Sequence, residues 1–341
     1  MPNSKPKHIL VIRLSAMGDV AMTVPVLRAF TEQYPDIKVT VLTRDFFKPF
    51  FRDLQNVSVF AADLKGTHKG FFGLLELSKE LRTLGIDAVA DLHNVLRSNI
   101  LKLFLLDLKP VQIDKGRSEK KALVHGKTFV QLKTTHQRYR DVFAKLGVPI
   151  KDSDPNFPER SELNLKTRKI VGEDTKSWIG IAPFAAYKSK MYPLELMEDV
   201  IEALSKDYKV LLFGGKTDAE YLDTLQSEHV YNLAGKLSLD EELDVISNLE
   251  VMLSMDSGNA HIAAMMGITV VTLWGVTHPY AGFYPFHQDE SFALLADRTK
   301  FTKIPTSIYG NKFPGGYEDC MKTILPEQII ERVKDVIKKP Y

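Results

Sequence analysis

Short apolar runs alternate with amphipathic stretches along the whole chain. Consecutive apolar positions rich in Val and Ile are typical of strands buried on both faces, whereas apolar positions three and four residues apart predict helices. We therefore predict strands over His8–Leu14, Lys38–Leu42, Val57–Phe60, Asp87–Asp91, Trp178–Ala182, Lys209–Phe213, Tyr231–Leu233, Val251–Ser254 and Thr269–Trp274. The predicted helices are Val24–Tyr34, Phe71–Leu84, Leu96–Leu106, Gln137–Leu146, Pro193–Ser205, Asp218–Ser227, Leu239–Asn248, Asn259–Met266 and Pro326–Lys338.

This alternation of strands and helices occurs in two series, which predicts two α/β domains with parallel sheets. A polar segment with Pro155 and Pro158 and no apolar period separates the series, and 341 residues suit two domains. We predict a first domain over 1–155, a linker over 156–177, a second domain over 178–325 and a C-terminal helix over 326–341.

Composition narrows the class of protein without deciding it. The chain is 44% hydrophobic and 26% charged, as in globular proteins, and a formal net charge of +2 favours no particular partner. Cys320 is the only cysteine, which excludes an internal disulfide and fits a reducing compartment. The apolar run Ile100–Leu108 is too short to span a bilayer, and no signal-peptide pattern precedes the first strand, so we expect a cytoplasmic protein.

The loop Ser15–Asp19 directly follows the first predicted strand, and ligands of open α/β sheets bind at the carboxyl ends of strands. The loop offers one glycine and one carboxylate, Asp19, which could take part in chemistry or simply cap the loop. It lacks the G-x-G-x-x-G fingerprint, which disfavours a nicotinamide oxidoreductase, and the chain has no P-loop pattern.

Two segments of the second series could bind a phosphate group. Met255–His261 follows a strand and opens a helix, whose free N–H groups suit a nucleotide diphosphate. The alternative is an ordinary helix cap with a buried His261. Lys188 and Lys190 follow the strand Trp178–Ala182, where a cation could stabilise a leaving phosphate, or the two lysines could belong to a solvated loop.

Two weaker signals concern charge. Asp218 follows a glycine turn, where a carboxylate could bind sugar hydroxyls. The basic stretch Lys115–Lys145 favours an anionic partner, although most such runs are solvated faces. No RNA-binding motif or recognition helix accompanies it, so we do not expect nucleic acid. Scattered histidines and one cysteine predict no metal site, and we expect no cofactor and no serine-nucleophile elbow.

Several segments, in this order, resemble one family along nearly the whole chain. They are HILVIRLSAMGDVAMTVPVLRAF, DLHNVLRS, HQRYRDVFAKLG, KSKMYP, NLAGKLSLDEE, DSGNAHIAAMMGITVVTLWGVTHP and DCMKTILPEQIIERV. Together they resemble glycosyltransferase family 9, the ADP-heptose:lipopolysaccharide heptosyltransferases.

The resemblance implies a GT-B type fold, with two Rossmann-like domains facing each other across a cleft. The N-terminal domain would bind the acceptor and the C-terminal domain the nucleotide sugar. The implied enzyme is an inverting, metal-independent glycosyltransferase that moves heptose from ADP-heptose to an anionic glycolipid of the lipopolysaccharide core or lipid A type. It would act in the cytoplasm, with peripheral contact to the inner membrane.

The resemblance also assigns roles to residues. Asp19 corresponds to the catalytic base, Lys190 to a lysine on the donor phosphate, and Leu237 to the position against the nucleotide base. The implied donor-binding residues are Ala185, Ala186, Lys190, Asp218, Leu237, Asp256, Ser257, Gly258 and His261. The implied acceptor-binding residues are Met17, Gly18, Arg97, Lys120, Lys121 and Arg138.

The chain departs from the family pattern in the donor pocket. Ala185 and Ala186 stand where the family often has two threonines, and Asp218 replaces what is commonly Glu. These changes leave open a member that uses another nucleotide sugar and acceptor. A non-catalytic homologue that binds nucleotide sugar is the other alternative, against which the presence of both Asp19 and Lys190 speaks.

Overall fold

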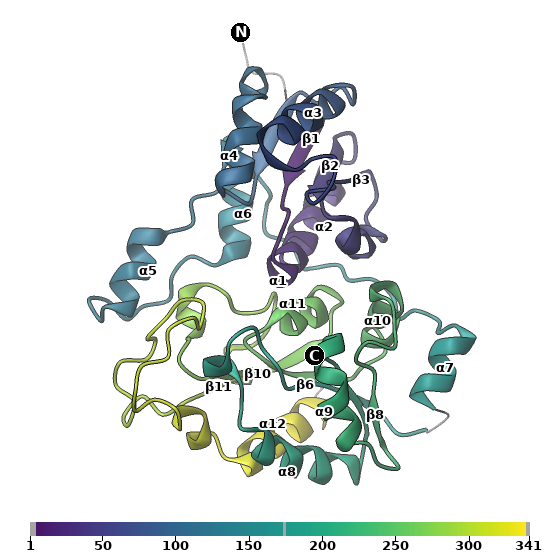
Figure 1. Ribbon diagram of the computed structural model, residues 1–341, viewed down its shortest axis with the longest axis vertical. Coiled ribbons are helices and arrows are strands. Elements are labelled where there is room, and N and C mark those ends of the chain that lie inside the picture. Colours follow the sequence, from purple (N-terminus) through teal and green to yellow (C-terminus); the bar gives the residue numbers. More distant parts are fainter. Residues whose placement is uncertain (1–4, 173–174, 339–341) are drawn as a thin grey trace. The chain divides into compact units, whose positions relative to one another are not determined.

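The computed structural model describes residues 5–172 and 175–338 (Figure 1). The chain divides into two compact units, which we describe separately. The N-terminal unit comprises Met1–Lys115 and Thr135–Asn156, and the C-terminal unit comprises Gly116–Thr134 and Phe157–Tyr341. The predicted segments 1–155, 156–177 and 326–341 include residues 1–4, 173–174 and 339–341, which lie outside the described residues.

The N-terminal unit is built on a parallel sheet with the strand order β3-β2-β1-β4-β5. Its strands are β1 (His8–Ile12), β2 (Lys38–Thr43), β3 (Val57–Ala61), β4 (Ala88–Asp91) and β5 (Val111–Gln112). Its helices are α1 (Met17–Ala21), α2 (Thr23–Gln33), α3 (Gly70–Arg82), α4 (Leu96–Leu103) and α6 (Thr135–Lys145). The strand order reverses between β1 and β4, so a ligand crevice is expected beyond the carboxyl ends of these two strands.

The C-terminal unit has a six-stranded parallel sheet of order β11-β10-β9-β6-β7-β8. Its strands are β6 (Trp178–Ala182), β7 (Lys209–Leu212), β8 (Val230–Asn232), β9 (Val251–Met255), β10 (Thr269–Trp274) and β11 (Ala293–Leu295). Its helices are α5 (Arg117–Val124), α7 (Leu165–Val171), α8 (Leu194–Ser205), α9 (Ala219–Thr224), α10 (Leu239–Ile246), α11 (Gly258–Met265) and α12 (Pro326–Lys338). This is the Rossmann order, and its reversal lies between β6 and β9.

The prediction of two α/β domains with parallel sheets is confirmed. Most of the predicted strands are largely buried, as in β9 and β10, whereas β3 is only partly buried. Five short elements were missed: α1, β5, α5, α7 and β11. One of them, α7, lies inside the predicted linker and buries Thr167 and Val171.

One segment differs from the predicted domain boundary. Residues 116–134 were expected in the first domain, but they belong to the C-terminal unit. Leu123 and Leu132 form a small apolar cluster with Ala281, and the Leu132 N–H donates to the Tyr280 carbonyl at 3.0 Å. Among the described residues, no helix is both long and apolar enough to cross a membrane.

Candidate active site

The carboxyl end of β1 leads into the turn that holds Asp19. Its Oδ2 forms an ion pair with Nη2 of Arg13 at 2.6 Å, and Nη1 of Arg13 donates to the Leu92 carbonyl at 2.6 Å. Arg13 is buried, whereas 29% of the Asp19 side chain is exposed. The ion pair with the buried Arg13 guanidinium therefore fixes the position of the Asp19 side chain. The other carboxylate oxygen of Asp19, Oδ1, has no hydrogen-bond partner among the described residues and is available to a ligand.

The backbone of this turn is fixed from helix α6. The Tyr139 hydroxyl donates to the Asp19 carbonyl at 3.2 Å. Tyr139 is completely buried, and burial raises the pKa of its phenol well above the usual range, so it remains a donor. Met17 and Gly18, two predicted acceptor residues, begin α1 beside Asp19 and are partly exposed.

The end of β4 adds a second group to this edge of the sheet. The side chain of Asp91 is fully buried, pairs with Lys102 at 2.7 Å and accepts the His93 N–H at 2.9 Å. His93 Nε2 lies 3.4 Å from Ser15 Oγ. Burial, with the charges of Arg13 and Lys115, lowers the pKa of His93 to about 4, so its ring is neutral at pH 7.

A pocket of about 370 Å³ opens beside these groups within the N-terminal unit. Its lining residues are Leu14, Ser15, Arg44, Leu64, His93, Val95, Leu96 and Arg97. Arg97 was predicted from the sequence. Arg44 was not, although it directly follows the strand β2, and its Nε donates to the Leu14 carbonyl at 3.0 Å. Two cations and no acid therefore line a pocket that shares Ser15 with the Asp19 turn.

In the C-terminal unit, Lys190 and Asp256 meet at the reversal of strand order. Lys190 lies in a 3₁₀ turn after β6, and Asp256 directly follows β9. Lys190 Nζ lies 2.9 Å from Asp256 Oδ2, with both side chains nearly buried. Thr277 Oγ1 donates to the same carboxylate oxygen at 2.8 Å. The structure thus brings together two predicted donor residues and adds Thr277, which sequence analysis missed.

Helix α11 begins next to this pair, as predicted. Ser257 occupies the N-cap, and its Oγ lies 3.0 Å from Ser254 Oγ. Gly258 is the first helical residue, and His261 is buried one turn inside. Since the first N–H groups of a helix have no partner within it, this end can bind an anion beside Lys190.

The other predicted donor residues make no direct polar contact with the Lys190–Asp256 pair among the described residues. Asp218 closes its own turn, since its Oδ2 accepts the Gly215 N–H at 2.7 Å. Leu237 is partly buried and precedes the N-cap of α10. Ala185 packs partly against the core of the unit, whereas Ala186 is exposed. Among the described residues, no hydrogen bond joins these four to Lys190 or Asp256.

The basic stretch Lys115–Lys145 is not one exposed face. Lys120 is buried, with Nζ 4.1 Å from the centre of the Phe283 ring in the C-terminal unit. Arg138 is buried in the N-terminal unit and donates to the Asp114 carbonyl at 3.3 Å. Of the three predicted acceptor cations in this stretch, only Lys121 is exposed.

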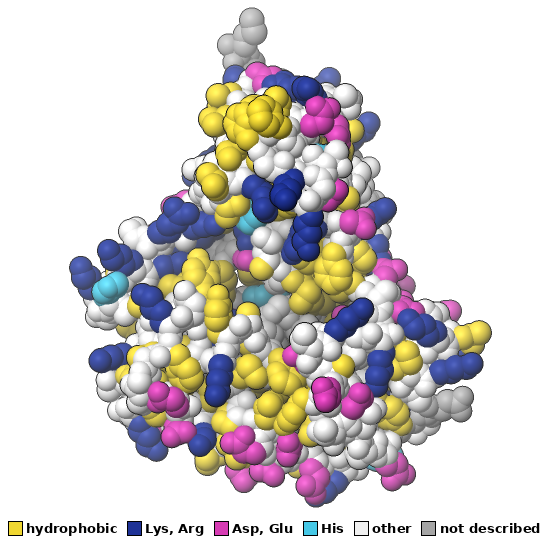
Figure 2. All heavy atoms as spheres, viewed as in Figure 1, with side chains coloured by type: hydrophobic (Ala, Val, Ile, Leu, Met, Phe, Trp, Pro, Cys, Tyr) yellow, Lys and Arg dark blue, Asp and Glu magenta, His cyan; other side chains and the backbone are white. Residues whose placement is uncertain are grey.

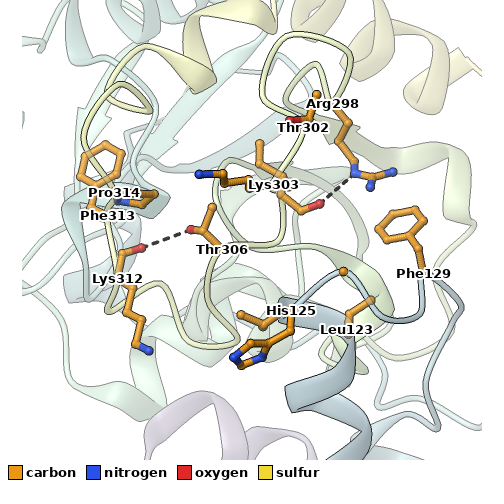
Figure 3. A pocket seen from close by; sticks show the side chains of 13 residues that line it. Leu123, His125, Phe129, Arg298, Thr302, Lys303, Thr306, Lys312, Phe313 and Pro314 are labelled. Atoms are coloured by element: carbon orange, nitrogen blue, oxygen red, sulfur yellow. Dashed lines mark hydrogen bonds between the residues drawn. The ribbon is translucent and has the colours of Figure 1, made fainter.

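A second pocket, of about 690 Å³, lies in the C-terminal unit beside helix α5 (Figure 3). The lining cations are Arg298, Lys303 and Lys312, with His125 beside them and no acid among the lining residues. The Arg298 guanidinium lies 3.4 Å from the centre of the Phe129 ring. This site was missed, although the stretch 298–312 contains four cations and no acid.

Comparison with known proteins decides the family. Residues 74–300 match the model of glycosyltransferase family 9 (heptosyltransferase). The chain belongs to this family. It is therefore a glycosyltransferase, as the sequence motifs indicated.

Individual proteins agree with this assignment. The chain is 26% identical to lipooligosaccharide heptosyltransferase 2 of Haemophilus influenzae, over 97% of this chain and all of that protein. Its fold matches that of a family 9 glycosyltransferase from Veillonella parvula, with a TM-score of 0.76 and 21% identity over 98% of both chains. It also matches the E. coli ADP-heptose lipopolysaccharide heptosyltransferase II, with a TM-score of 0.69 and 19% identity over 97% of this chain and 98% of that one. These likenesses confirm the predicted GT-B class.

Proposed function

We propose that this glycosyltransferase moves heptose from ADP-heptose to a phosphorylated glycolipid of the lipopolysaccharide core or lipid A type. The curated relatives are lipopolysaccharide and lipooligosaccharide heptosyltransferases, which supports the transferred sugar and the acceptor class. The observation that carries the proposal is the Asp19 carboxylate, which Arg13 holds by one oxygen while the other remains available. The reaction would take place in the cytoplasm, at the inner face of the inner membrane.

The donor diphosphate would bind in the C-terminal unit. Lys190 and the first turn of α11 offer positive charge within one small region, and Asp256 orients Lys190 at 2.9 Å. Fixed cations and N–H groups stabilise the negative charge that develops on a leaving diphosphate. In this proposal Ala185, Ala186, Leu237 and Asp218 surround the sugar and nucleoside, together with Ser257, Gly258 and His261.

The acceptor would use the pocket of the N-terminal unit that contains Arg44 and Arg97. Two arginines with no lining acid fit a phosphate or carboxylate group, which they can bind with paired hydrogen bonds. The neutral His93 ring lies on the same pocket wall and can donate to or accept from a sugar hydroxyl. Arg298, Lys303 and Lys312 of the second pocket can bind an anionic group within the C-terminal unit.

The chemical step would be a single displacement. Asp19 Oδ1 accepts the proton of the acceptor hydroxyl while that oxygen bonds to the anomeric carbon. The bond between this carbon and the diphosphate oxygen breaks, and ADP leaves with the electron pair. One displacement inverts the anomeric configuration. Asp19 then returns its proton to water.

Replacing Asp19 by Asn tests this proposal. Transfer should fall by about 10²–10⁴-fold, the usual contribution of a general base, because the amide cannot accept the proton. Mass spectrometry of a heptose-free glycolipid incubated with ADP-heptose measures transfer. Calorimetric binding of ADP should remain, whereas a variant with more than a tenth of normal turnover would remove Asp19 from the mechanism. Asp36→Asn, at an exposed position of the same unit, is the matched control.

The donor is tested separately, since the alternatives are another nucleotide sugar or a homologue that binds without turnover. A melting-shift screen with ADP-, UDP-, GDP- and CMP-sugars identifies the nucleotide, because a ligand at 100 times its dissociation constant adds about 2.7 kcal/mol of stability. Stabilisation by another nucleotide alone would overturn ADP-heptose. Stabilisation by ADP-heptose without any product would favour the non-catalytic homologue.

A further inference from the structure

An apolar patch lies on the surface of the N-terminal unit, where α3 begins and α4 ends. Phe71 is 55% exposed, Phe72 81%, Leu103 63% and Leu106 61%. The Phe71 ring lies 5.8 Å from that of Phe72 and 5.2 Å from that of Phe104, so the two helices contribute to one surface. We call Phe71, Phe72, Leu103, Phe104 and Leu106 the aromatic patch. Figure 2 shows hydrophobic side chains gathered over this part of the unit.

Phe71 and Phe72 do not belong to the core of the unit. Helix α3 buries Leu74, Leu77 and Leu81 in the core, whereas Phe71 and Phe72 lie in its first turn, outside the core. Leaving a Phe side chain exposed forgoes the stabilisation that its burial would give. Contiguous exposed apolar surface of this kind is typical of interaction sites.

Three lysines lie close in sequence to the residues of the aromatic patch. Lys65, Lys69 and Lys109 are exposed and form no ion pair with any described residue. Nearby acids are largely engaged, since Glu76 pairs with Lys79 at 3.0 Å and Asp107 pairs with Arg82 at 2.6 Å. A further acid, Asp63, accepts backbone N–H groups of its own loop, at 2.9 Å from Gly66.

We propose that the aromatic patch docks the protein on an anionic lipid surface, with Phe71 and Phe72 inserted among the acyl chains. Lys65, Lys69 and Lys109 would contact the headgroups. Aromatic side chains beside lysines suit the boundary of a bilayer, because the rings can insert while the lysines attract anionic headgroups. The combination of apolar surface and unpaired cations favours a membrane over a second protein.

The position of the aromatic patch also fits the proposed acceptor pocket. Leu96 and Arg97 at the start of α4 line that pocket, whereas Leu103 at the end of the same helix belongs to the aromatic patch. At 1.5 Å per residue the two sites lie about 10 Å apart along the helix. Docking would therefore bring the pocket close to a glycolipid headgroup. This part of the inference rests on the proposed function, whereas docking itself does not.

Cosedimentation of the full chain with vesicles tests the docking. Vesicles of phosphatidylethanolamine with phosphatidylglycerol should bind the protein, and vesicles of phosphatidylcholine alone should bind it weakly. Replacing both Phe71 and Phe72 by Ser should lower the partition coefficient at least tenfold, because the variant has no rings to insert among the acyl chains. A tenfold change corresponds to about 1.4 kcal/mol. Leu165→Ser, at a position 77% exposed in the C-terminal unit, is the matched control and should bind normally.

A second variant tests the cations independently. Lys65→Glu with Lys69→Glu should weaken binding to anionic vesicles and reduce its dependence on salt. Both variants should keep the melting temperature and the affinity for ADP. Unchanged vesicle binding in both variants would overturn the proposal.

The same experiments distinguish lipid docking from self-association, and they separate failure of the docking from failure of the proposed function. Docking on lipid would be overturned if the wild-type protein is a dimer that does not bind vesicles while the Phe71, Phe72 double variant is a monomer. This result would assign the aromatic patch to an interface between two copies of the chain. Normal vesicle binding without heptose transfer would leave the docking intact while overturning the proposed function.

Discussion

The aliphatic stem of Lys190 lies directly against the backbone of Gly310. A Cβ atom at Gly310 would stand 2.4 Å from Lys190 Cδ and 2.5 Å from Cγ. Ser189 fixes the same contact, because its hydroxyl donates to the Gly310 carbonyl. The loop around Gly310 therefore sets the direction in which the Lys190 ammonium group points.

Gly310→Ala should weaken donor binding. The methyl group would displace the lysine stem, and the φ of +80° at this position adds about 1–2 kcal/mol of strain. We expect about a tenfold rise in the dissociation constant of ADP, measured by calorimetry on the folded variant. Gly315→Ala is the control, since a Cβ there meets nothing within 4 Å and no left-handed backbone is required. Equal ADP affinity in both variants would show that Gly310 does not position Lys190.

Arg13→Lys should slow transfer without affecting the donor. An ammonium group cannot reproduce the two contacts of the guanidinium, with Asp19 and with the Leu92 carbonyl. Misplacing the base by a fraction of an ångström should lower kcat about tenfold or more, which corresponds to at least ~1.4 kcal/mol. Arg82→Lys, in an exposed ion pair of the same unit, should leave kcat unchanged because such pairs are worth little. Normal kcat in Arg13→Lys would exclude a positioning role.

The two adjacent lysines of α5 should respond differently to charge reversal. Lys120→Glu buries an anion against the Phe283 ring, so thermal stability should fall by more than about 2 kcal/mol. Lys121→Glu changes an exposed position, and its stability should stay within about 0.5 kcal/mol. If the acceptor is anionic, Lys121→Glu should also raise its KM and reduce the salt dependence, while the donor KM stays constant. A KM that changes equally for both substrates would argue against an acceptor contact.

Treatment with EDTA should leave transfer unchanged. Among the described residues, no group of three or more His, Cys, Asp or Glu side chains could hold a metal ion. Lys190 and the start of α11 provide positive charge for the diphosphate without a divalent ion. Activity lost on chelation and restored by magnesium or manganese would contradict this expectation.

Neighbouring carboxylates of α10 should have opposite effects on stability. Burial raises the pKa of Glu242 to about 7, whereas Lys166 and the Ser238 N–H lower the pKa of Glu241 to about 2. The raised pKa means that ionising Glu242 destabilises the fold, a penalty that develops as pH rises from about 4.5 to 7. Glu242→Gln should therefore stabilise the protein at pH 8, by at most about 3 kcal/mol, and have little effect at pH 4.

Glu241→Gln is the matched comparison. The lowered pKa means that the Glu241 carboxylate stabilises the fold above about pH 4.5, and that this stability is lost as pH falls toward 2. This variant should melt earlier than the wild type at pH 8. Melting curves of both variants at pH 4 and pH 8 measure these effects, and the same sign for both at pH 8 would contradict the assignment.

The sequence predicted the fold well because most of the longer strands are buried on both faces, β3 being the exception. Runs such as Val251–Ser254 and Thr269–Trp274 are typical of a parallel sheet, and each is followed by a loop at its carboxyl end. The same rule located Asp19, Lys190 and Asp256, since they follow strands next to a reversal of strand order.

What the sequence could not predict depends on tertiary contacts. Arg13 is part of an apolar strand segment, and only the structure shows that it meets Asp19 six positions later. Gly310 lies in a loop outside the segments that resemble the family, and Thr277 lies inside one of them without an assigned role, although both shape the surroundings of Lys190. Lys120 and Arg138 belong to a visibly basic stretch, but nothing in the local sequence shows that their side chains are buried.

Because residues 116–134 belong to the C-terminal unit, neither unit is a continuous piece of chain. A fragment ending at residue 155 would contain Leu123 and Leu132 without Ala281, with which they pack. A chimera that combines the N-terminal and C-terminal units of two related enzymes should therefore fold only if residues 116–134 come from the same enzyme as the C-terminal unit. Each unit is encoded by two separate stretches of the gene. Recombination at any single site would therefore separate segments that fold together in one unit.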